Sequence, residues 1–360
     1  MIAGTLGRYF ATRFFKTIAL VFFGVFALIY AIDLVETLRR AGDTPQAGGL
    51  LMAWLALLHT PLVAEQALPF IVLFGAMISF LNLSRKLELV VARSAGVSVW
   101  QFIAPSLAVV VAVGVVSVAL GNPASTAMKR QSDRIEAKLF GAGAAESGAG
   151  VWIRQKSVDG EAVIHADGRD DTGPSLFHVQ VYNFDSKGEF AERVDATEAT
   201  LRDGYWRLDH ADVVTPGFDT LPTGAYLLAT TLTKTEVAQA FAPPETVSFW
   251  SLPALADQTE RAGLNAVGYR LQYQELLATP LMLAAMVLVA ACFSLRFFRM
   301  GGVQSMVSGG VAAGFVLYVA TKLVNDLGAA GFFSAPVAGW SPAVVGCVAG
   351  VYVLLHQEDG

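Results

Sequence analysis

Basic side chains at two places in the sequence are the best candidates for binding a ligand. Arg39 and Arg40 follow the first long apolar run, and Lys129, Arg130 and Arg134 follow the third. A guanidinium group carries a planar set of donors that binds phosphate oxygens bidentately. The two groups together therefore predict a phosphate-binding collar. The same pattern also fits side chains that anchor helix ends by reaching to a membrane surface.

Two acids precede the arginine pair and leave its chemistry open. Asp33 and Glu36 lie within two turns of Arg39 and Arg40 if this stretch is helical. The carboxylates either pair with the arginines or coordinate divalent cations that bridge the phosphates of a substrate. The sequence does not choose between these two interpretations.

A carboxylate marks the second candidate site, in the stretch NLSRKLELVVARSAGVSVW (82–100), between two apolar runs. Its spacing predicts a short amphipathic helix over 84–98, with Gly96 placed to end it. Such a helix lies either in the lipid headgroups or in a groove of a partner protein. Glu88 favours the groove, because an anionic leaflet repels a carboxylate whereas a protein can pair it.

Small residues mark a third candidate site. Gly310 and Gly314 form a G-x-x-x-G step in one late apolar run, and Gly346 and Gly350 repeat it in the next. Small residues allow membrane helices to approach closely. The step therefore predicts tight helix packing, with a moving gate as the more specific alternative.

Motifs for an enzyme are weak. The sequence has no G-x-x-x-x-G-K-[ST] phosphate loop, and the Gly-rich stretch 141–150 lacks the lysine. Ser308, in VSGG, resembles a weak nucleophile motif, but the five histidines are scattered. Cys292 and Cys347 both lie inside apolar runs, so there is no cysteine metal site. We expect no catalytic residue, no metal ligands and no cofactor in this chain.

The elements that must position these residues are mostly membrane helices. Hydrophobic residues make up 54% of the 360 and charged residues only 15%, and apolar runs of about 20 residues match the thickness of a bilayer. A further apolar segment, 51–63, is predicted to be interfacial or re-entrant. Six spans are expected, at about 14–32, 64–83, 102–121, 276–295, 303–324 and 337–355.

The middle of the chain differs from the spans. Between residues 122 and 268 lie 34 of the 55 charged residues, after a helical lead-in that continues the third span. Alternating apolar and polar residues, with turns at DSKG and RDG, predict an antiparallel sandwich or partly open barrel. The residues expected on its inner face are Val163, Phe177, Val179, Val181, Phe184, Leu201, Trp206 and Leu208.

The predicted fold is therefore an α-helical membrane protein with three spans (1–121), an inserted antiparallel β domain (122–268) and three further spans (269–360). Basic residues in short loops favour the cytoplasmic side. With both termini inside, one face collects Arg8, Arg13, Lys16, Arg85, Lys86, Arg93, Arg296 and Arg299, against Arg39 and Arg40 on the other. The β domain is then expected outside.

Several motifs together resemble the lipopolysaccharide-export permeases of the LptF/LptG family. They are RYFATRFF and DLVETLRRAGD around the first span, SRKLELVVARSAGVSVWQF after the second, GVWIRQ and VYNFDSKGEF in the middle, and GFVLYVATKLVNDLG in the fifth. Their order and spacing cover nearly the whole chain. LRRAGD and GYWRL favour the LptG branch over LptF.

The resemblance implies a permease subunit in the bacterial inner membrane, with cytoplasmic termini and a periplasmic jellyroll-like β domain. It implies lipopolysaccharide as the substrate, a homologous permease, LptF, and a cytoplasmic ATPase dimer, LptB, which binds the ATP. Cargo would pass to bridge proteins with LptC-type β-jellyrolls, and no nucleic acid is involved. The residues implied for ATPase coupling are Leu87, Glu88, Val91, Ala92 and Arg93. Arg39 and Arg40 would meet lipid A phosphates, and a lateral gate would involve the fifth span with Gly310 and Gly314.

Two other functions compete with this reading. A mechanotransmitting ABC subunit shares the docking helix and the external domain but usually has four spans. An ion-coupled lipid transporter would use intramembrane acids such as Glu65, Glu275 and Asp326.

Overall fold

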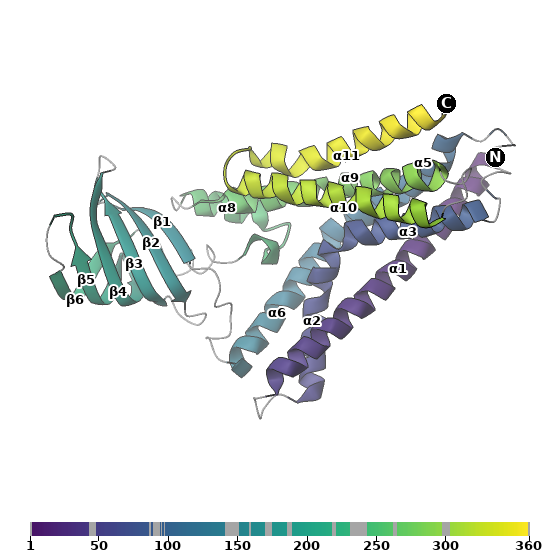
Figure 1. Cartoon of the computed structure of the whole chain (residues 1–360). Helices are drawn as coiled ribbons and strands as arrows, with labels where there is room; N and C mark the ends of the chain where they lie inside the picture. Colours follow the sequence, from purple (N-terminus) through teal and green to yellow (C-terminus); the bar gives the residue numbers. More distant parts are fainter. Residues whose placement is uncertain are drawn as a thin grey trace.

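The computed structural model describes residues 2–42, 48–85, 88, 94, 96, 98–140, 151–157, 160–169, 175–185, 189–217, 221–230, 243–261, 265–296 and 303–358. A helical body and a β-sheet form separate parts of the molecule (Figure 1). In this part of the chain, six helices are long and apolar enough to cross a membrane. The prediction of six spans interrupted by an antiparallel β insertion is confirmed.

The first helices form an arm that leaves the bundle. Helix α1 (Ile2–Ala41) packs along α2 (Gly49–Gln66), and α3 (Leu68–Arg85) follows after the single residue Ala67. Helix α2 covers the apolar segment expected to be interfacial. It packs between α1 and α6 (Asn122–Phe140) and buries one side, including Met52 and Leu55, while the second span proper is α3.

The third span continues into the middle of the chain. Helix α5 (Val99–Val116), a π-helical turn η1 (Ser117–Gly121) and α6 (Asn122–Phe140) follow one another without a break. Ser98 begins α5 with a capping box, in which its side chain and that of Gln101 each bond the other's backbone N–H. The helical lead-in predicted after this span is therefore present.

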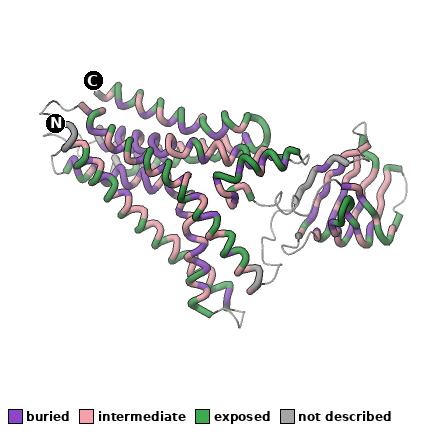
Figure 2. The backbone as a smooth tube through the Cα atoms, turned by 180° about the vertical axis from the view of Figure 1, so that it is seen from behind, coloured by how far each residue is buried: buried purple, intermediate pink, exposed green. Residues whose placement is uncertain are grey.

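The later spans surround one central helix. Helix α9 (Val267–Arg296) packs against α3, α5, α10 (Val303–Ala329) and α11 (Ala335–Glu358). Its alanine-rich stretch lets neighbours approach closely on several sides, and Leu283, Met286 and Val287 are fully buried. Figure 2 shows buried residues along the lines where these helices meet.

The inserted domain contains a single described sheet of six antiparallel strands in sequence order. The strands are β1 (Val151–Ser157), β2 (Gly160–Arg169), β3 (Ser175–Phe184), β4 (Phe190–Arg202), β5 (Tyr205–Val214) and β6 (Leu221–Ala229). The predicted turn at Asp203–Gly204 joins β4 to β5, and Gly204 has φ +88°, a value that suits glycine. The sheet curls so that its edge strands meet, and the Gln155 side chain of β1 donates to the carbonyl of Ala229 and accepts from Thr230 beside β6.

The inner face of the sheet follows the prediction at five of the eight positions, and Phe184 is only half-buried and lies outside the buried cluster of the sheet. Val179, Val181, Leu201, Trp206 and Leu208 are at most 1% exposed. Phe177 is 40% exposed, so its inward assignment is wrong, and on β2 the buried residues are Ala162, Ile164 and Ala166 rather than Val163.

The physical reason on β3 is the backbone of His178, which has φ +50° and interrupts the alternation. Leu176 before it and Val179 after it therefore both face inward. His210 on β5 has φ +53° and produces the same shift between Leu208 and Ala211. The predicted domain boundaries at 121/122 and 268/269 stay predictions.

The chain returns from the sheet onto the π-helical turn. After η2 (Pro244–Thr246), the backbone N–H of Phe249 donates to the Asn122 side chain at 2.8 Å, and the Trp250 indole donates to the carbonyl of Ala119 at 3.1 Å. Helix α8 (Leu252–Arg261) then leads into α9. Both bonds fall at η1 or at the first residue of α6, so the segment that leaves the sheet is attached to the third span here.

Candidate functional site

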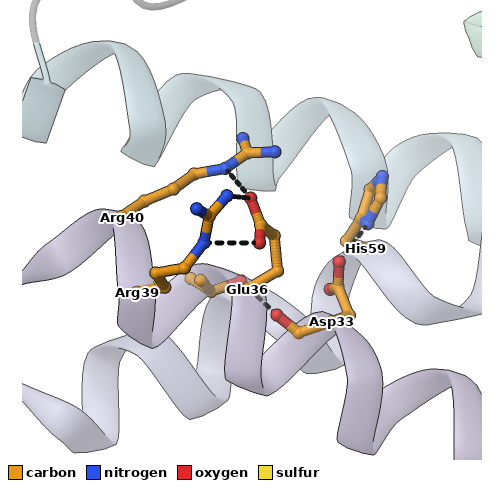
Figure 3. Close-up of polar contacts among 6 residues, drawn as sticks. Asp33, Glu36, Arg39, Arg40 and His59 are labelled. Atoms are coloured by element: carbon orange, nitrogen blue, oxygen red, sulfur yellow. Dashed lines mark hydrogen bonds and ion pairs between the residues drawn. The ribbon is translucent and has the colours of Figure 1, made fainter.

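The arginine pair at the end of α1 is organised by one carboxylate. Glu36 accepts from Arg39 Nε at 3.0 Å and Nη2 at 2.9 Å, and from Arg40 Nε at 3.1 Å. Helical spacings of three and four residues bring these side chains together (Figure 3). The three groups carry a net charge of +1, and both arginine side chains remain well exposed, at 76% and 64%.

This geometry leaves donors for a ligand. A guanidinium group has five N–H donors, of which the bonds to Glu36 use two on Arg39 and one on Arg40. Arg39 and Arg40 thus share one carboxylate, and most of their N–H groups make no bond to it. Such an arrangement can bind a multivalent anion such as a phosphate group.

The second acid has a different partner. Asp33 Oδ1 lies 3.0 Å from His59 Nδ1 of α2, so this pair joins the first two helices (Figure 3). Its Oδ2 is buried and has no hydrogen-bond partner among the described residues. Of the two acids that were expected either to pair with the arginines or to coordinate divalent cations, Glu36 pairs with the arginines, whereas Asp33 pairs with His59. Among the residues that the structure describes, no group of three or more His, Cys, Asp or Glu could hold a metal ion.

The second basic group lies on α6, near the same end of the arm. Lys129 pairs with Asp133 at 2.8 Å, and Arg130 and Arg134 are exposed. A small apolar cluster joins the ends of three helices here: Ala41 of α1, Leu51, Met52 and Leu55 of α2, and Ile135 and Leu139 of α6. The structure thus brings the two basic groups to one end of the arm, with α2 packed between their helices, although binding by them stays a prediction.

The candidate coupling residue makes contacts inside the chain. Glu88 accepts from Arg13 Nη1 at 2.7 and 2.8 Å, one distance to each carboxylate oxygen. Tyr9 OH lies 3.4 Å from Glu88 Oε2 and accepts from the same Arg13 nitrogen at 2.8 Å. Gly96 has φ +82°, as expected for a residue that ends a helix. Ser84 and Arg85 are the last residues of α3, and Leu87, Val91, Ala92 and Arg93 lie outside the described residues.

The glycine step packs inside the bundle. A Cβ added to Gly310 would lie 2.6 Å from Met77 Cε, and one added to Gly314 would lie 2.2 Å from Leu73 Cδ2, so both glycines face α3. A Cβ on Gly350 of α11 would similarly lie 2.7 Å from Leu288 of α9. The positions support the packing interpretation, and the gate stays a prediction.

Sequence reasoning missed the pairs that cross between elements. Arg13 with Glu88 and Asp33 with His59 are separated by 75 and 26 residues, so no local spacing connects them. The one available signal was the presence of ionisable side chains inside or beside apolar runs, which usually find partners. The sequence indicates Arg13 only as one of the basic residues on the predicted cytoplasmic face.

These features define a class, a multi-span membrane protein with a β insertion and paired ionisable groups at both ends of its first helix. Residues 8–356 match the family model of the lipopolysaccharide export system permease LptF/LptG, and the chain belongs to this family. The family predicted from the motifs is confirmed.

The relatives are LptG proteins, in agreement with the branch that the motifs favour. The chain is 23% identical over 334 residues to the lipopolysaccharide export system permease protein LptG of Escherichia coli strain K12, covering 90% of each chain. It is also 23% identical over 333 residues to the protein of the same name from Haemophilus influenzae strain KW20 / Rd, covering 89% of this chain and 90% of the relative.

Proposed function

We propose that this chain is the permease subunit of an ABC transporter that extracts lipopolysaccharide from the bacterial inner membrane. A homologous permease, LptF, completes the membrane part, and a cytoplasmic LptB dimer hydrolyses the ATP. Both termini are cytoplasmic, and the β domain is periplasmic. Cargo passes along that domain to LptC-type β-jellyroll proteins.

The observation that carries this proposal is the arrangement along α1 in a chain of this family. Arg39 and Arg40 are exposed and share the Glu36 carboxylate at one end of the helix, whereas Glu88 contacts its other end through Arg13. A phosphorylated glycolipid fits the first feature, because guanidinium groups bind phosphates with two parallel hydrogen bonds. A docking helix for a separate ATPase fits the second.

The two ends also match the distribution of basic residues. The N-terminus of α1, the end of α3, the start of α5 and the end of α11 lie together at one end of the bundle (Figure 1). This end carries Arg8, Arg13 and Arg85, which the positive-inside rule assigns to the cytoplasm. The six candidate spans also disfavour a mechanotransmitting subunit, which usually has four.

Co-purification tests the proposal. An affinity-tagged copy of the full chain, extracted in mild detergent from its own cells, should bring with it an ATPase dimer, a homologous permease and bound lipopolysaccharide. A matched preparation of the Glu88→Lys variant should still contain the permease and the ATPase, so that a loss of coupling can be distinguished from a loss of assembly. Recovery of the wild-type chain without any ATPase would contradict the proposal.

A further inference from the structure

The contact between Glu88 and α1 is more than a surface ion pair. One guanidinium nitrogen of Arg13 lies within 2.8 Å of both carboxylate oxygens, and the Tyr9 hydroxyl bonds to both partners. The Arg13 and Glu88 side chains are only 22% and 28% exposed. Fully exposed ion pairs contribute little because water screens them, but this pair is partly shielded from water and shares a third polar group.

The part of α1 that carries Arg13 is packed against two other helices. Phe10 and Phe14, on the same turns of α1, are at most 4% exposed. The Phe10 ring centroid lies 4.8 Å from that of Phe102 on α5, and the Phe14 centroid 5.8 Å from that of Phe80 on α3. Phe80 and Phe102 also contact each other at 5.7 Å. The start of α1, the end of α3 and the start of α5 therefore form one packed unit beside Glu88.

The charge balance changes the role expected of Glu88. Arg13 balances the charge of the Glu88 carboxylate within the chain, so Glu88 has a partner on α1 in addition to any contact with another protein. What the pair does provide is a fixed link between the segment around Glu88 and α1. Helix α1 then runs about 39 Å from Arg13 to Arg39 at 1.5 Å per residue.

We propose that Arg13, supported by Tyr9, is the positioning residue that holds the coupling segment to α1 through Glu88. Movement of that segment then displaces α1 and, at its far end, the arginine pair. This inference rests on the proposed function, because it assumes that an ATPase moves the segment. It assigns the defect of a Glu88→Lys change to repulsion from Arg13 within the chain.

Charge reversal tests the link. The assembled complex, in proteoliposomes with lipopolysaccharide, is assayed for lipopolysaccharide released per ATP hydrolysed. Arg13→Glu and Glu88→Lys should each lower this ratio by about tenfold, and the double variant Arg13→Glu/Glu88→Lys should recover most of it. Arg8→Glu, an exposed change one turn earlier on α1, is the matched control and should leave the ratio unchanged.

The outcomes separate this inference from the proposed function. A double variant no better than Glu88→Lys alone overturns the inference, and Glu88 then acts directly on the ATPase, as the proposed function allows. An Arg8→Glu defect as large as that of Arg13→Glu overturns it as well. Normal export by Glu88→Lys would also overturn the inference, whereas the proposed function fails only if the wild-type chain is recovered without an ATPase or without lipopolysaccharide.

A conservative pair of variants decides the matter if the reversed pair does not assemble. Arg13→Lys keeps the charge beside Glu88 and should retain most of the released lipopolysaccharide per ATP, whereas Arg13→Gln should lose about tenfold. ATP hydrolysis itself should persist in both variants. Equal ratios in Arg13→Lys and Arg13→Gln would overturn the inference.

Discussion

Replacing Gly314 with alanine should destabilise the helical bundle, because the added Cβ has no room. It would lie 2.2 Å from Leu73 Cδ2, far inside the separation of about 3.5–4.0 Å at which carbon atoms make contact. Leu73 is 0% exposed and belongs to the main core of the bundle, so its methyl group moves only by displacing neighbours. Overpacking of this kind costs about 1–3 kcal/mol in protein cores.

A matched glycine removes the effect of helix propensity from the comparison. Gly24 of α1 has nothing within 4 Å of an added Cβ, so Gly24→Ala should gain up to about 1 kcal/mol from the better helix propensity of alanine. The same gain applies at Gly314. The difference in unfolding free energy between the two variants should therefore be the packing term alone, about 1–3 kcal/mol.

The assay is thermal or denaturant unfolding of the purified chain in one detergent, followed by tryptophan fluorescence. In the Leu73→Ala background, Gly314→Ala should lower the unfolding free energy by less than it does in the wild-type chain, because the two side chains share one space. Gly314→Ala as stable as Gly24→Ala would refute the close contact of α10 with α3. Full export by Gly314→Leu in an intact complex would separately count against a gate at this position.

Three further predictions concern the remaining sites. Arg39→Ala/Arg40→Ala should weaken photocrosslinking to lipopolysaccharide about tenfold or more, since two phosphate-directed groups are lost, and unchanged crosslinking would reduce both residues to membrane anchors. Glu88→Lys should abolish export measured in cells while the chain still inserts, and normal export would remove the coupling assignment. Asn122→Ala should lower stability by about 1–3 kcal/mol, because it leaves the buried backbone N–H of Phe249 unpaired; an unchanged unfolding midpoint would contradict the attachment at the π-helical turn.

The spans and the strands were predictable because each is a local pattern. Apolar runs of bilayer length located the helices, although α1 and α9 extend well beyond the predicted spans. The Asp203–Gly204 turn was visible because its chemistry resides in two adjacent residues. Helix α2 was visible only as an apolar segment, because its packing between α1 and α6 depends on residues distant in the chain.

The inner face of the sheet shows where local patterns fail. Strict alternation placed Phe177 inward, but the left-handed backbone of His178 turned Leu176 inward instead. Histidine is enriched among non-glycine residues with positive φ, but such residues are uncommon, so the residue type alone does not predict this conformation at His178. The sequence also could not assign the partners of the two acids on α1. Asp33 pairs with His59 of the next helix rather than with the nearby arginines, and no local spacing predicts this contact.

The central claim is that ATP hydrolysed by another polypeptide drives this chain to release lipopolysaccharide from a membrane. The most direct measurement is the release of labelled lipopolysaccharide from proteoliposomes that hold the chain alone, the permease pair, or the pair with its ATPase. We predict release only from the last preparation, and only with hydrolysable ATP. Equal release from the chain alone, or without nucleotide, would contradict the claim.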